Sequence, residues 1–208
     1  MILKLIVFEF LFVCVGFSEE LMYRGYHLTN IAEGFNFKAT DPKYSIGIAV
    51  FLSSILFGVF HLGSPGANLI SIFIIFLMAI LLSFAYALTG RLAMPVGVHI
   101  AWNLFQGNIF GFPVSGTTFP AETATFFSIQ QSGPDLWTGG AFGPEGGLLG
   151  VVAIIAGIFL IVVWIRFRYG IIKLYTPLAL PPTKEKRVNC KLRLSDWNVS
   201  VCAINTPE

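Results

Sequence analysis

Apolar residues form long runs along the chain, separated by short polar connections. The runs at 2–30, 45–62, 68–89, 93–111 and 147–165 each approach or exceed the roughly 20 residues of a helix that crosses a membrane. Gly63-Ser64-Pro65-Gly66 separates the second run from the third, and no charged residue occurs between positions 44 and 90. The pattern predicts an all-α fold, a polytopic transmembrane helix bundle of about five spans.

The composition agrees with a membrane protein. Of the 208 residues, 55% are hydrophobic and 12% are charged, whereas a soluble domain carries about a quarter charged residues. The formal net charge of +2 is too small to indicate a nucleic-acid partner. We therefore expect membrane lipid as a partner, and no nucleic acid.

The chain divides into a membrane domain and a tail. Residues 1–182 form the expected transmembrane domain, and 183–208 are polar and basic, a composition typical of a disordered tail. Within the domain, 111–147 is rich in Gly, Pro, Ser and Thr, which predicts a lid or a cap at the membrane surface.

A helix that begins at Met1 suggests further spans upstream. A signal peptide is the alternative, but its cleavage would leave the charged pattern at positions 19–24 unexplained.

Basic residues indicate the orientation of the bundle. Most of the Lys and Arg residues lie from Arg166 onward, so we expect a cytoplasmic C-terminus. Alternation of the helices then places Lys38, Lys43 and Arg91 on the same side. This agreement supports an integral membrane protein with its C-terminus in the cytoplasm.

Two adjacent carboxylates, Glu19 and Glu20, lie within the first predicted helix, just after its apolar part ends at Phe17. Burying such a group in hydrocarbon costs at least about 2.5–3.5 kcal/mol, so the pair needs a partner or a function. Arg24 follows Glu20 by four residues, which places guanidinium and carboxylate on one helix face. Glu19 is rotated about 100° from Glu20 and is left available for chemistry.

Two further polar patterns occur on other predicted helices. They are Phe57-x-x-x-His61 and His99-x-x-x-Asn103, and the second spacing puts imidazole and carboxamide on one helix face. Each pattern alone could serve only as a hydrogen bond between helices. Together with the carboxylates, such costly groups are better explained by convergence on one site. His61 reaches that site only if the Gly-Ser-Pro-Gly turn lies within the bilayer, surrounded by protein or a watery cavity.

These residue types fit peptide-bond hydrolysis. A buried Glu can take a proton from water as the water attacks a carbonyl, and His99 with Asn103 could stabilise the resulting oxyanion. A nucleophile elbow of the Gly-x-Ser-x-Gly type does not occur in the sequence. Cofactors remain open, because metal-free and zinc-dependent versions of this chemistry both fit the sequence. With zinc, Glu19, His61 and His99 would form a minimal set of three ligands with an open fourth position.

At this point the ordered patterns resemble the CPBP intramembrane peptidases, which group CAAX prenyl endoproteases with bacteriocin-processing and bacteriocin-immunity proteins. The resemblance covers about residues 12–165 and implies a glutamate-type metalloprotease, an integral protein of the bacterial cell membrane. It implies catalytic roles for Glu19 and His61, which would activate and hold the water, and for His99 and Asn103, which would stabilise the oxyanion. The supporting residues that it implies are Glu20, Arg24 and Phe57.

The predicted function is therefore an intramembrane endopeptidase that cleaves a membrane-associated or lipidated protein or peptide. One alternative is a non-catalytic membrane protein of the immunity or scaffold type that keeps the patterns as a polar core. Another is a small proton-coupled transporter that uses Glu19 as its proton site, although the sequence lacks the paired repeats of such folds. Substitution of Glu19 distinguishes the first alternative from an enzyme. An enzyme should lose cleavage and stay folded, whereas a non-catalytic protein should lose only stability.

Overall fold

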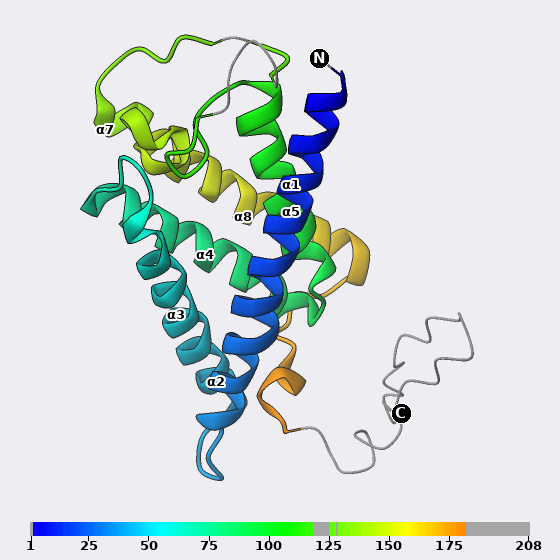
Figure 1. Cartoon of the computed structure of the whole chain (residues 1–208). Helices are drawn as coiled ribbons and strands as arrows, with labels where there is room; N and C mark the ends of the chain where they lie inside the picture. The colour runs from blue at the N-terminus through cyan, green and yellow to red at the C-terminus, as the bar shows by residue number, and fades with distance from the viewer. Residues whose placement is uncertain (1, 119–124, 128, 182–208) are drawn as a thin grey trace.

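The computed structural model describes residues 2–118, 125–127 and 129–181. These residues form helices and one isolated bridge between Val114 and Thr117, without a β-strand in the described ranges. The predicted tail, 183–208, lies outside them. Figure 1 shows the bundle, in which successive long helices run in alternating directions.

The first predicted helix is one continuous rod with a change of helix type in its middle. It consists of α1 (Ile2–Glu20), the π-helix η1 (Leu21–Leu28) and α2 (Thr29–Gly34). A π-helical segment widens the turn and is frequent at functional sites. Here it begins directly after the two carboxylates predicted for the site.

The second and third helices form a hairpin with well-defined ends. They are α3 (Pro42–Phe60), continued by η2 (His61–Gly63), and α4 (Leu69–Thr89). The Asp41 side chain caps α3, and Asn68 forms a capping box with Ser71 at the start of α4. Gly90 ends α4 in the left-handed region, with φ of 64°. The prediction that the turn at 63–66 separates two helices is confirmed.

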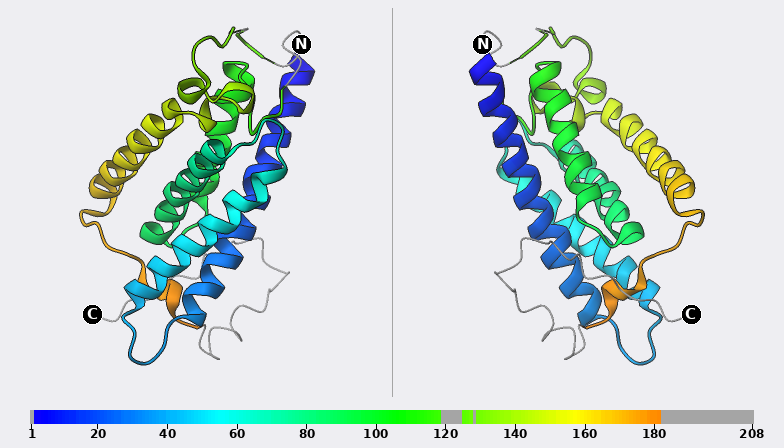
Figure 2. Two further views of the ribbon diagram at one scale, coloured as in Figure 1. Left: turned by 90° about the vertical axis from the view of Figure 1, so that its left-hand side faces the viewer. Right: turned by 90° about the vertical axis from the view of Figure 1, so that its right-hand side faces the viewer.

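The fourth and fifth helices complete the bundle. The fourth consists of α5 (Ala93–Asn103) and the π-helix η3 (Leu104–Ile109), and the fifth is α8 (Leu148–Tyr169). In Figure 2, α8 lies on one side of α4 and α5, while α1 lies on the other. An apolar core from α4, α5 and α8 fills the first interface. A second core joins α2, α3 and the end of α4 to η6 (Thr176–Ala179) at the end of the bundle opposite the N-terminus.

By length and composition, three of the described helical segments can cross a membrane: Pro42–Gly63, Leu69–Thr89 and Leu148–Tyr169. The all-α membrane bundle is thus confirmed, and the protein is an integral membrane protein. The count of three is lower than the expected five because α1 carries several charged residues and α5 has only 11 residues. The bacterial origin and the cytoplasmic C-terminus stay predictions.

The long segment between η3 and α8 folds over one end of the bundle. Its described part contains three short helices, α7 (Asp135–Thr138), η4 (Gly140–Phe142) and η5 (Pro144–Gly146). At position 116 a Cβ would come within 1.7 Å of the Pro65 oxygen, so this segment packs directly on the turn after η2. Its described part therefore forms a cap, as the sequence predicted, and covers the end of the bundle where His61 lies.

Candidate active site

Glu20, Arg24 and His99 form a buried polar cluster between the first helix and α5. The Glu20 carboxylate is 0% exposed and accepts hydrogen bonds from Arg24 Nη1 at 2.9 Å and from His99 Nδ1 at 2.7 Å. Arg24 also donates to the Ala79 carbonyl of α4 at 2.9 Å. The pairing of Glu20 with Arg24 is as predicted. The bond to His99 was not predicted, and it fixes the orientation of the imidazole.

Glu19 faces the other side of the same imidazole. Its carboxylate lies 3.9 Å from His99 Nε2, and its side chain is 18% exposed, whereas Glu20 is fully enclosed. The expected division of the acidic pair is therefore present in the geometry. The Glu20 carboxylate accepts hydrogen bonds from two donors, whereas the Glu19 carboxylate faces the cavity.

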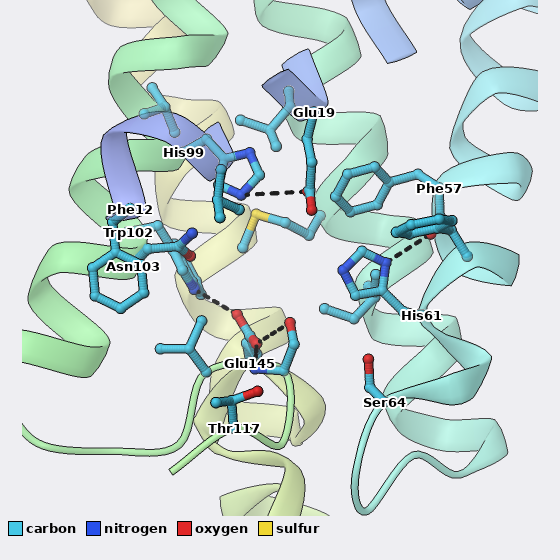
Figure 3. A pocket seen from close by; sticks show the side chains of 18 of the residues that line it. Phe12, Glu19, Phe57, His61, Ser64, His99, Trp102, Asn103, Thr117 and Glu145 are labelled. Carbon is cyan, nitrogen blue, oxygen red and sulfur yellow. Dashed lines mark hydrogen bonds and ion pairs between the residues drawn. The ribbon is translucent and has the colours of Figure 1, made fainter. Parts of the chain in front are cut away.

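Phe57 lies in the last turn of α3, and His61 is the first residue of η2. The His61 Nδ1 atom donates to the Phe57 carbonyl oxygen at 2.8 Å, so the lone pair of the neutral ring lies on Nε2. Figure 3 shows this second nitrogen directed into the cavity. The Phe57 ring lies 4.7 Å from the Arg24 guanidinium and 4.7 Å from the His61 ring, so it packs between the buried cluster and His61.

Asn103 is the last residue of α5, one helical turn after His99. The two side chains are 5% and 9% exposed, and both line the cavity. The π-helix η3 begins at the next residue, as η1 begins directly after Glu20. The predicted alignment of His99 and Asn103 on one face of the helix is therefore present.

The four residues predicted as catalytic line one cavity of about 280 Å³. Glu19, His61, His99 and Asn103 face it from α1, η2 and α5 (Figure 3). Most of the remaining wall is apolar, with side chains from α1, α3, α4 and α5. A carbonyl group in this space meets carboxylate, imidazole and carboxamide groups in surroundings that exclude much of the bulk water. The depth of the site in a bilayer stays a prediction.

The three residues expected as zinc ligands are not arranged as a metal site in the described part of the chain. Glu19, His61 and His99 share the cavity, but no group of three or more His, Cys, Asp or Glu side chains in the described ranges is placed to hold a metal ion. The hydrogen bonds of both histidines do not count against a metal, because Nδ1 donates to Glu20 or to the Phe57 carbonyl and Nε2 is left available, as in metal-binding histidines. As the three side chains are placed in the described part of the chain, they do not form a three-ligand zinc site.

A second carboxylate, which the sequence analysis did not single out, lines the cavity together with that of Glu19. Glu145, in η5, is 4% exposed and accepts hydrogen bonds from Trp102 Nε1 at 3.0 Å and from the Ser115 hydroxyl and backbone N–H. Burial raises the pKa of Glu145, and the hydrogen bonds from Ser115 and Trp102 oppose this change in part. Glu145 lies just before an apolar run, as Glu19 and Glu20 lie just after one. This was the signal that could have identified it.

Comparison with known proteins agrees with the resemblance stated above. A family model described as Rce1-like, type II CAAX prenyl endopeptidase, matches residues 2–105, which is half of the chain. The match includes all seven residues predicted for the site. Comparisons with curated proteins and with solved structures found no match.

Proposed function

Because the chain belongs to the Rce1-like family of type II CAAX prenyl endopeptidases, we propose that it is an intramembrane endopeptidase whose general base is Glu19. The observation that carries the proposal is the placement of Glu19 in a cavity that it shares with His61, His99 and Asn103. Glu20 cannot serve as the base, because its carboxylate already accepts from Arg24 and His99 and is closed off from the cavity.

The proposed reaction begins with a water molecule between Glu19 and His61. The Nε2 lone pair of His61 accepts a hydrogen bond from this water, and Glu19 takes a proton as the water oxygen attacks the peptide carbonyl carbon. The protonated Glu19 then delivers that proton to the leaving amine as the C–N bond breaks. The products are a new carboxyl end and a new amino end.

His99 and Asn103 stabilise the negative charge that forms on the carbonyl oxygen. To donate to this oxygen through Nε2, His99 must carry a proton on both ring nitrogens, because its Nδ1 already donates to the Glu20 carboxylate. Asn103 donates through its side-chain amide from the same helix face. In comparable sites each such donor contributes about 3–4 kcal/mol to stabilisation of the transition state.

The proposed substrate is a membrane-associated or lipidated peptide. The family description supports a prenylated peptide of the CAAX type, and the mostly apolar cavity wall suits an apolar side chain beside the scissile bond. Such a peptide partitions into the bilayer, where exposed apolar helix surfaces of the bundle also lie. A prenylated CAAX peptide is therefore the probe for a first assay.

The experiment compares purified wild-type protein with Glu19→Ala and His99→Ala on a prenylated CAAX peptide, with products identified by mass spectrometry. We expect cleavage by the wild type and its loss in both variants, with cooperative thermal unfolding retained in each. Glu9→Gln is the matched control, since Glu9 lies exposed on the same helix. Cleavage by both variants at the wild-type rate would overturn the assignment. Loss of stability alone, with no cleavage by any form, would instead favour a non-catalytic scaffold.

A further inference from the structure

Glu145 joins three segments of the cavity wall, and the proposed reaction gives it no task. Its own segment, η5, immediately precedes α8, and its two carboxylate oxygens bind different partners. Oε2 accepts from Trp102 of α5, while Oε1 accepts from the Ser115 hydroxyl and backbone N–H in the cap. All three residues line the cavity. A buried carboxylate in this position therefore connects α5, the cap and the start of α8.

The contact with Ser115 holds an unusual backbone conformation. Ser115 has φ of 47°, and it is the only non-glycine residue with positive φ in the described part of the chain. A non-glycine residue in this region is strained and persists only where its surroundings hold it there. Here, the two hydrogen bonds that Ser115 donates to Glu145 Oε1 hold this conformation.

The second contact of Glu145 is with Trp102, which directly precedes Asn103 in the chain. Trp102 and Asn103 are the last two residues of α5, where the helix changes to the π-helix η3. The same junction is tied to the cap a second time, since Gln106 donates to the Pro113 carbonyl at 2.6 Å. The indole bond to Glu145 thus fixes the end of α5 from the cavity side.

We infer that Glu145 is a positioning residue that holds Asn103 in place through Trp102 and keeps the cap closed through Ser115. This role rests on the proposed function, since Asn103 donates to the oxyanion only in that reaction. Glu145 does not touch the reacting atoms, because its oxygens are engaged by Trp102 and Ser115. Its loss should therefore resemble the loss of Asn103 rather than the loss of Glu19.

The test is a double-variant cycle on the full-length protein with the prenylated CAAX peptide. Glu145→Gln replaces Oε2 or Oε1 by an amide that cannot accept, and we expect kcat to fall about 10- to 100-fold while KM changes little. Trp102→Phe keeps an aromatic ring but removes the N–H, and should give the same result. The decisive form is Asn103→Ala with Glu145→Gln, which should be no slower than Asn103→Ala alone.

Controls separate positioning from general damage to the fold. Trp164→Phe changes a half-exposed indole on α8, and Glu9→Gln removes an exposed carboxylate from α1, so neither should alter kcat. If Glu145→Gln does not fold, Trp102→Phe with Asn103→Ala gives the same cycle. Equal rate losses with and without the Asn103 side chain, or an unchanged kcat in Glu145→Gln, would overturn the positioning role alone. A wild-type protein without Glu19-dependent cleavage would overturn the proposed function, and the role of Glu145 with it.

Discussion

Replacing each member of the acidic pair by glutamine should separate catalysis from stability. Glu20→Gln removes a fully buried negative charge and leaves the Arg24 guanidinium, itself 1% exposed, without its counter-charge. Glu19→Gln removes a carboxylate that is 18% exposed and has one long contact, 3.9 Å to His99. The two substitutions are chemically identical and lie one residue apart. Their different surroundings therefore determine the expected results.

The expected magnitudes follow from these surroundings. Breaking a buried ion pair by removing one partner costs about 3–5 kcal/mol of unfolding free energy. For a chain of this size that loss lowers the melting temperature by on the order of 10 °C. A partly exposed pair contributes about 0–1 kcal/mol, so Glu19→Gln should unfold close to the wild type. Cleavage should be lost in Glu19→Gln, and it should also fall in Glu20→Gln because His99 Nδ1 exchanges a charged acceptor for a neutral amide oxygen.

The assay measures thermal unfolding by tryptophan fluorescence in one detergent, together with cleavage of the prenylated peptide by the same preparations. A Glu20→Gln protein as stable as the wild type would refute the assignment of Glu20 to the buried cluster. A Glu19→Gln protein that loses as much stability as Glu20→Gln would refute the division of roles between the two carboxylates.

Two further predictions concern helix packing and pH. A Cβ at Gly16 would lie 2.7 Å from the Ile100 side chain, so Gly16→Val should push α1 away from α5. This substitution should lower the free energy of unfolding by about 1–3 kcal/mol and reduce cleavage. Gly47 has open space around it, so Gly47→Val should change neither stability nor cleavage. Equal effects of the two valines on Tm and rate would contradict this packing. Burial raises the pKa of Glu145 above its usual 4.5, so the folded state binds the proton more tightly than the unfolded state does. Tm should therefore fall as the pH rises above about 4.5 toward the raised pKa. Glu145→Gln should remove that part of the slope, and parallel Tm profiles for the two proteins would contradict it.

The helices were largely predictable because long apolar runs and Gly-Pro turns are local signals. The ends of α4 and the division at 63–66 needed no information beyond the sequence. The short π-helical segments at Leu21–Leu28 and Leu104–Ile109 were not predicted, because tertiary packing rather than residue preference selects them. The expected number of spans exceeded the number that length and composition support.

The candidate site was predictable only in part. Spacing by four residues placed Glu20 beside Arg24 and aligned His99 with Asn103, since both relations lie within one helix. The bond from His99 to Glu20 joins residues 79 positions apart, and no local pattern contains it. Glu145 was missed for the same reason, because its partners belong to α5 and the cap.

The central claim is that Glu19 acts as the base in peptide-bond hydrolysis. Its most direct test is to measure binding and cleavage of one prenylated CAAX peptide by wild-type protein and by Glu19→Gln. We predict similar affinity for the peptide and cleavage slower by about 10²–10⁴-fold in the variant, the usual contribution of a general base. Cleavage by Glu19→Gln at a rate close to that of the wild type would contradict the claim.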